Sequence, residues 1–289
     1  MTDSKIDPKK PKPFSDKPEV AAALPSVDVG AFAPRKQEDD IIPQQGMDLA
    51  DKPKLIFVIG RGKTGKTTFL RWVAENALDR NRPFLMADID PTNASFSSYF
   101  PDVSRPSGHD PAEVRSWVQR FIGYAVENKT TALIDLGGGD TALRSLLAEM
   151  PSLLADVEAA GLAVVAYYMC GPQPDDLAPL LTLASHGFAP KTRALIFNEG
   201  VADAGLPRLQ AFAEILSHPV VQEETRAGTL ALCMPRLFAA AAVENSRASF
   251  AQARDGDASR PINMFDRARV KSWLTAMGQR FSGVASWMP

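Results

Sequence analysis

Lys66 and Thr67 close a glycine-rich segment that has the spacing G-x-x-x-x-G-K-T. This spacing is typical of a P-loop, in which the lysine reaches the β- and γ-phosphates and the hydroxyl binds Mg²⁺. The glycines remove Cβ atoms, so that backbone N–H groups can surround a polyphosphate. The predicted nucleotide contacts are Gly60, Arg61, Gly62, Lys63, Thr64, Gly65, Lys66, Thr67 and Thr68. A chance glycine-rich turn also satisfies the motif, so the flanking elements have to decide.

Carboxylates follow two further apolar stretches. Asp88 and Asp90 end the stretch 83–90, and Asp135 ends the stretch 131–135, with three glycines after Leu136. Strand ends in an open α/β sheet share one edge, so these acids are expected near Lys66. There they can hold the water ligands of Mg²⁺ and orient an attacking water. The alternatives are an Asp-Pro turn after residue 90 and an ordinary strand-end aspartate at 135.

The elements that must position these groups alternate between strand and helix. The run 55–59 is continuously apolar, as in a buried parallel strand, and 68–80 has helical periodicity. Further strands are predicted at 83–90, 131–135, 162–169, 192–197 and 229–234, and helices at 111–128, 143–147, 153–160, 175–186, 239–253 and 263–281. This order predicts an α/β P-loop NTPase fold, a doubly wound and mostly parallel sheet flanked by helices.

Composition favours a globular domain behind a disordered tail. The 289 residues are 45% hydrophobic with a net charge of −2, so binding to nucleic acid or membrane would need a local patch. Residues 1–52 are rich in Pro, Lys and Asp and are predicted to be disordered, and 53–289 are predicted to form the ATPase domain. Cys170 and Cys233 are expected to be buried in a reducing compartment. No transmembrane segment is evident, and we expect a cytoplasmic protein.

Several other residues are open to more than one interpretation. Asn198, at a predicted strand end, could bind a base edge or cap the next turn. Phe96, Tyr99 and Phe100 are expected to be exposed in a loop. From Glu244 onward there are seven Lys or Arg against four Asp or Glu, a modest excess that suits either non-specific DNA contact or a solvated surface.

The order of these motifs resembles the ParA/MinD family of P-loop ATPases. The P-loop, Asp-x-Asp-Pro, the strand-end Asp with glycines, the strand-end Asn and Met-Pro-Arg-Leu at 234–237 all occur in that order. The segment 88–96, Asp-Ile-Asp-Pro-Thr-Asn-Ala-Ser-Phe, looks most like TraL-type members encoded with conjugation and plasmid-mobilisation genes. The resemblance covers about residues 54–282. It implies binding of ATP and Mg²⁺, an ATP-dependent homodimer, and slow hydrolysis that resets the switch.

The resemblance also implies roles for individual residues. Lys66 and Thr67 would hold phosphate and Mg²⁺, Asp90 would position the attacking water, and Asp88 and Asp135 would support the metal, while Asn198 and the Pro235 region would face adenine. Arg61 stands where the family has a lysine that crosses the dimer to the partner's phosphates. Lys63 stands where the family has its second glycine.

Three functions are compatible with this sequence. The leading hypothesis is an ATP-driven switch for plasmid or DNA transfer or segregation that works with an unidentified partner protein. The alternative is a nucleotide-dependent adaptor with weak or no ATPase activity that docks a membrane or secretion complex. A small-molecule ligase or kinase of the same fold is a third, because fold does not determine function.

Overall fold

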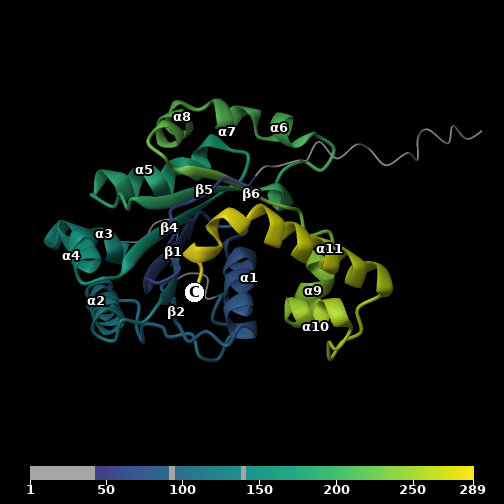
Figure 1. Cartoon of the computed structure of the whole chain (residues 1–289), viewed down its shortest axis with the longest axis horizontal. Helices are drawn as coiled ribbons and strands as arrows, with labels where there is room; N and C mark the ends of the chain where they lie inside the picture. The colour runs from purple at the N-terminus through teal and green to yellow at the C-terminus, as the bar shows by residue number, and fades with distance from the viewer. Residues whose placement is uncertain (1–42, 91–94, 138–140) are drawn as a thin grey trace, which may run out of the picture. The chain divides into compact units, whose positions relative to one another are not determined.

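The computed structural model describes residues 43–90, 95–137 and 141–289. In these residues six parallel strands form one sheet in the order β2-β3-β1-β4-β5-β6 (Figure 1). The strands are β1 Lys54–Gly60, β2 Leu85–Asp88, β3 Ala132–Gly137, β4 Ala163–Cys170, β5 Thr192–Asn198 and β6 Leu230–Met234. The predicted α/β fold with a doubly wound parallel sheet is therefore confirmed.

Helices cover both faces of this sheet. They are α1 Lys66–Asp79, α2 Pro111–Glu127, α3 Thr141–Glu149, α4 Leu153–Ala159, α5 Ala178–Ser185, α6 Arg208–Ala211, α7 Ala213–Ser217, α8 Pro219–Arg226, α9 Ala240–Ser246, α10 Phe250–Asp255 and α11 Met264–Arg280. Short 3₁₀ turns occur at η2 Pro174–Leu177, η3 Glu199–Val201 and η4 Ser282–Trp287. Two predicted helices are divided. The helix expected at 175–186 begins as η2, and the one at 239–253 is interrupted where Arg247 adopts a left-handed conformation.

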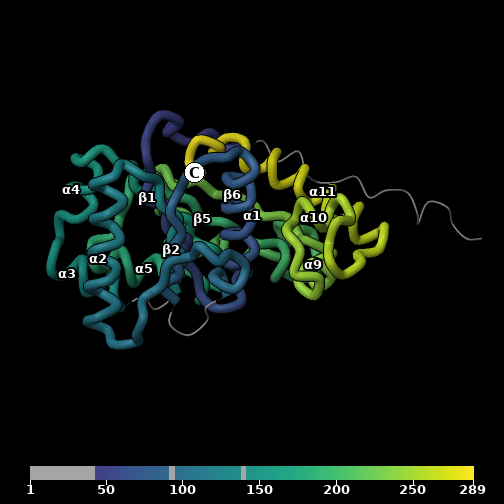
Figure 2. The backbone as a smooth tube through the Cα atoms, turned by 90° about the horizontal axis from the view of Figure 1, so that it is seen from below, coloured from purple at the N-terminus to yellow at the C-terminus, as the bar shows by residue number. Residues whose placement is uncertain are grey.

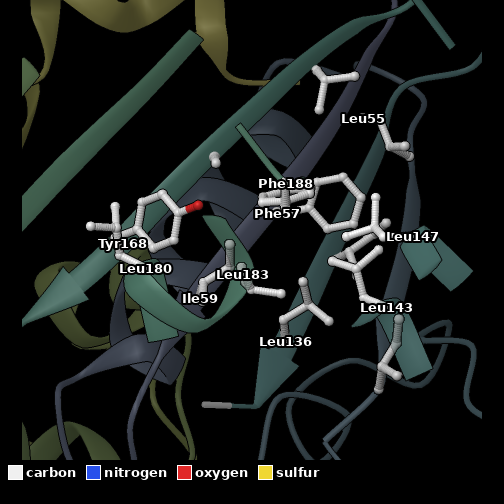
Figure 3. Packing of buried hydrophobic residues seen from close by; sticks show 14 of the residues in the cluster. Leu55, Phe57, Ile59, Leu136, Leu143, Leu147, Tyr168, Leu180, Leu183 and Phe188 are labelled. Atoms are coloured by element: carbon white, nitrogen blue, oxygen red, sulfur yellow. The ribbon is translucent and has the colours of Figure 1, made fainter. Parts of the chain in front are cut away.

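Alternate residues of each central strand face opposite cores. Leu55, Phe57 and Ile59 of β1 pack with leucines of α3 and α5, as Figure 3 shows. Ile56 and Val58 point to the other face, where α1, α9, α10 and α11 lie (Figures 1 and 2). This period of two matters for the site, because it sends Asp88 and Asp135 to the face that carries α1.

Residues 43–52 belong with the α/β unit, although the predicted tail extended to residue 52. Leu49 is buried, and its N–H donates to Ser286 Oγ at 3.1 Å. Trp287 Nε1 donates to the carbonyl of Met47 at 2.7 Å. The apolar side chain of Leu49 and these hydrogen bonds hold the segment against η4. The rest of the predicted tail, residues 1–42, lies outside the described residues.

Two expectations about burial are corrected. Phe96 is fully buried, because the loop after β2 folds onto the α1 face and stacks Phe96 edge-on against Phe100, with ring centroids 5.4 Å apart. Tyr99 and Phe100 are half-buried. Cys170 is buried as expected, whereas Cys233 on β6 is only half-buried. None of the helices in the described residues has the length and apolar character needed to cross a membrane.

Candidate functional site

The P-loop connects β1 to α1 at the carboxyl edge of the sheet. Gly60, the last residue of β1, pairs with Gly137 of β3 and Met169 of β4. A Cβ at position 60 would lie 2.8 Å from Thr64 Oγ1 and 2.9 Å from Met169 Cβ. Glycine is therefore required here by packing against the loop and the neighbouring strand, independently of any ligand.

The other P-loop positions differ in what they demand of the backbone. Gly65 has φ of +89°, and a Cβ there would lie 2.0 Å from Asn198 Nδ2, so only glycine fits. Lys63 has φ of +69°. This left-handed conformation is unfavourable for any residue that carries a Cβ. A Cβ added at Gly62 would have no heavy atom within 4 Å among its described neighbours. Packing in the protein does not explain glycine at 62, which leaves close approach of a phosphate as the predicted reason.

Lys66 lies among the predicted carboxylates. Its ammonium is largely buried, forms an ion pair with Asp135, and lies 3.6 Å from Asp90 Oδ2. Burial raises the pKa of Asp135 to about 6, against the opposing effect of Lys66. The second oxygen, Asp135 Oδ2, is buried and has no hydrogen-bond partner among the described residues. A buried carboxylate oxygen of this kind can accept a hydrogen bond from a metal-bound water.

The predicted metal-binding groups lie nearby but already have protein partners. Thr67 Oγ1 is 2.6 Å from Ser95 Oγ. Asp88 accepts from the N–H groups of Asp90 at 3.2 Å and Ser97 at 3.1 Å, so it shapes the loop after β2. A direct metal role for Asp88 remains a prediction.

The donor set of this site fits Mg²⁺. Across the described residues, no group of three or more His, Cys, Asp or Glu is arranged to hold a metal. Mg²⁺ in nucleotide sites uses few protein ligands besides phosphate and water, so the Thr67 hydroxyl as a ligand, with the Asp135 oxygen accepting from a metal-bound water, would suit it.

Arg61 extends from the P-loop to an acidic pair on η2. Its guanidinium lies 3.5 Å from Asp175 Oδ2 and 3.8 Å from Asp176 Oδ1, and the side chain is 45% exposed. Exposed ion pairs of this length contribute little to stability. Arg61 is therefore available for another anion, and its predicted contact across a dimer stays a prediction. Thr64 is buried and donates its hydroxyl hydrogen to the carbonyl of Arg61 at 2.8 Å.

Asn198 supports the P-loop from behind. Its Nδ2 donates to the carbonyl of Thr64 at 2.9 Å, and its Oδ1 accepts from the N–H of Gly200 at 2.8 Å. The turn-capping interpretation is thus confirmed, while the support of the P-loop was not foreseen, because it joins residues 134 positions apart. The carbonyl of Pro235 accepts from Trp273 Nε1 at 2.8 Å. Contact of Asn198 or Pro235 with adenine stays a prediction.

A cavity of about 460 Å³ opens from the P-loop along α1. Its size falls within the range of about 300–1,000 Å³ that is usual for small-molecule sites. Of the predicted site residues, Arg61, Gly62, Lys63, Gly65, Lys66, Thr67, Thr68 and Asp90 line it. Leu237, from the predicted Pro235 region, also lines it. The remaining lining residues were not assigned to the site from the sequence: Arg71, Ser95, Ser98, Tyr99, Ala240, Val243, Glu244 and Phe250. Neither Asn198 nor Pro235 is among the lining residues.

Two predicted motifs extend beyond the described residues. Residues 91–94, the middle of the TraL-like segment 88–96, are outside them, as are residues 138–140 with two of the three glycines after Leu136. The C-terminal cations are described. Arg254, Arg267 and Lys271 line a groove between α10 and α11 that also includes Asp255. Arg254 is paired with Asp255, and Arg267 donates to the carbonyl of Asp255 at 2.7 Å.

Comparison with known proteins identifies no family. No protein-family model matches the chain, and no curated protein matches it. Among solved structures, the chain is similar to chloroplast FtsY from Physcomitrella patens, with 14% sequence identity and a TM-score of 0.39. The match covers 67% of this chain and 62% of the FtsY chain, less than two thirds of that chain's length. A likeness at this level assigns no function.

Proposed function

We propose that this protein binds a Mg²⁺–nucleoside triphosphate at the P-loop and hydrolyses it. The observation that supports this most directly is the position of Lys66 at the start of α1, buried beside the unpartnered oxygen of Asp135. Backbone N–H groups at the start of a helix and a buried lysine together attract a polyphosphate. When Mg²⁺ is bound, it neutralises phosphate charge. Lys66 exchanges its carboxylate partners for phosphate oxygens, and Asp90, 3.6 Å from Lys66, orients the attacking water.

Binding tests this proposal directly. We expect Mg²⁺–ATP to bind the wild-type protein in calorimetry and to raise its melting temperature by mass action. Lys66→Ala should lose at least tenfold in affinity, because the phosphate loses a charge-assisted hydrogen bond. Lys191→Ala is the matched control, because Lys191 is exposed and paired with Glu158 on the surface. Equal affinity in the wild type and Lys66→Ala would refute the proposal.

The finer proposal is an ATP switch of the ParA/MinD type that acts in the cytoplasm, in plasmid or DNA transfer or segregation. The order of the sequence motifs supports it, and so does a half-exposed cation, Arg61, beside the phosphate site. We expect light scattering to detect a homodimer with Mg²⁺–ATP but not with Mg²⁺–ADP, and no dimer for Lys66→Ala. Arg61→Ala should dimerise more weakly. A monomer that binds ATP would favour the alternative of a nucleotide-dependent adaptor.

DNA is the proposed ligand of the groove between α10 and α11. Arg254, Arg267 and Lys271 supply the positive charge, although Asp255 offsets part of it. Binding through phosphate contacts should weaken steeply as salt concentration rises. Lys271→Glu should weaken binding of a random duplex and reduce the salt dependence. Binding that does not change with salt or with this variant would exclude the groove.

A further inference from the structure

We infer that the base of the bound nucleoside triphosphate stacks on Tyr99, in the part of the P-loop cavity that runs along α1 toward α10. This inference rests on the proposed nucleotide site and adds the position of the nucleoside. Sequence resemblance had placed the base near Asn198 and the Pro235 region. Leu237 of that region lines the cavity, but Asn198 and Pro235 themselves do not. Both already make hydrogen bonds to other parts of the protein.

The ring of Tyr99 packs against a buried guanidinium, that of Arg71. The Arg71 Cζ atom lies 3.9 Å from the centroid of the Tyr99 ring and 4.6 Å from that of Phe250. Arg71 has only 5% of its surface exposed. A buried cation against an aromatic face is a stronger contact than an exposed one, so the Tyr99 ring is held in place. Tyr99 is half-buried, and it lines the cavity.

Two hydrogen-bonded groups hold Arg71 in turn. Its Nη2 atom donates to Glu75 Oε1 at 3.2 Å and to the carbonyl of Ala248 at 2.9 Å. Glu75 Oε2 accepts from the N–H of Phe250 at 2.6 Å. The stack of Tyr99, Arg71 and Phe250 is therefore anchored to both α1 and the start of α10. A wall fixed in this way loses little conformational entropy when a ligand packs on it.

The length and composition of the cavity suit a nucleoside. Arg71 is five residues beyond Lys66, which places it about 7.5 Å farther along the helix axis. Thr68 lies between them and lines the cavity. The apolar residues Leu237, Ala240 and Val243 also line the cavity. A phosphate chain on the P-loop can thus continue into a cavity that an aromatic ring and aliphatic groups also line.

The experiment compares two ligands that differ only in the nucleoside. Calorimetry would measure the binding of ATP and of inorganic tripolyphosphate, each with Mg²⁺, to wild type, Tyr99→Ala and Tyr99→Phe. Loss of a base–aromatic stack should weaken ATP about 5- to 150-fold in Tyr99→Ala. Affinity for tripolyphosphate should stay within about twofold, because the P-loop is untouched, and Tyr99→Phe should bind both ligands like wild type.

Three results would overturn the inference. ATP affinity that is unchanged in Tyr99→Ala would place the base elsewhere. A parallel loss of ATP and tripolyphosphate affinity would show that Tyr99 only supports the P-loop. Wild-type protein that binds tripolyphosphate as tightly as ATP would show that the nucleoside makes no contact. If wild type binds neither ligand, both the proposed function and the inference are refuted. The first two results refute only the inference and remain compatible with the proposed function.

Discussion

Lys63 has the least favourable backbone conformation of the described P-loop residues. Its φ of +69° is one that glycine adopts readily, while a side chain raises the free energy. The neighbouring Gly65, at φ of +89°, meets the same demand without a Cβ. The lysine therefore reduces stability locally, and it places a positive charge in the lining of the cavity at the proposed phosphate site.

Lys63→Gly should stabilise the ligand-free protein. We expect the free energy of unfolding to rise by about 0.5–1 kcal/mol, because relief of the left-handed strain exceeds the added flexibility of the unfolded chain. Urea denaturation measures this change. Lys63→Ala is the control, because it removes the charge but keeps the Cβ. If both variants were stabilised equally, charge rather than backbone strain would be responsible.

Asp135 should make stability depend on pH. Its pKa is raised to about 6 in the folded protein, from an ordinary value of 3.8, mainly by burial. The folded state therefore binds the proton more tightly, so this contribution is complete below about pH 4 and is lost as pH rises to about 6. The shift corresponds to about 3 kcal/mol.

The measurement is the difference in unfolding free energy between wild type and Asp135→Asn from about pH 4 to pH 7. The asparagine stays neutral, so it removes this one titration while other carboxylates remain. We expect wild type to lose stability relative to the variant as pH rises. A difference that increases with pH would contradict the raised pKa.

At the scale of elements, α1 connects the P-loop to the C-terminal helices. Lys66 at its start pairs with Asp135 of β3. Farther along α1, Arg71 donates to the carbonyl of Ala248, between α9 and α10, and Glu75 accepts from the N–H of Phe250, the first residue of α10. Trp273 of α11 donates to the loop after β6. The helices that carry the basic groove are thus held against the helix that begins at the P-loop.

Glu75→Ala should detach α10 from α1. We expect a loss of about 2–4 kcal/mol, because Arg71 would keep a buried charge without its carboxylate partner. Hydrogen exchange at the amide of Phe250 should become faster, since that amide loses its acceptor. Glu75→Gln is the control, because it retains an acceptor oxygen for the Phe250 amide. Unchanged exchange at Phe250 in Glu75→Ala would show that the contact does not restrain α10.

At the scale of the α/β unit, the segment 43–49 is joined to the C-terminal 3₁₀ turn, η4. The N–H of Gly46 donates to the carbonyl of Gly283 at 2.9 Å. Both positions need glycine for close approach. A Cβ at Gly46 would lie 2.4 Å from the Trp287 ring, and one at Gly283 would lie 2.2 Å from the carbonyl oxygen of Gln44.

Gly283→Ala should weaken this junction. We expect a loss of about 1–3 kcal/mol, because the added methyl group meets backbone that has to move. Gly278→Ala is the matched control, since a Cβ at that position in α11 meets nothing within 4 Å and alanine favours a helix. Thermal denaturation compares the two variants. Equal melting temperatures would show that residues 43–49 contribute nothing to stability.

Much of the fold and part of the site followed from the sequence. The six strands and the P-loop were predicted because apolar runs, glycine spacing and strand-end acids are local patterns. Local patterns also placed Lys66 near Asp90 and Asp135, because the carboxyl ends of parallel strands share one edge. The helices of 199–228 were not predicted. Phe96 was wrongly expected to be exposed. The sequence of a loop does not indicate which part of the protein an aromatic side chain in that loop will pack against.

Only the tertiary structure decided the use of the remaining side chains. Asn198 supports the P-loop from a strand far along the chain, and Arg71 lies between Tyr99 and Phe250. Nothing in the spacing of these residues indicates such contacts, since each joins segments that meet only when the helices pack on the sheet. The sequence determined the residues of the proposed phosphate site at 60–68, because they are contiguous. The walls of the cavity depend on packing between segments far apart in the sequence, which local sequence patterns do not predict.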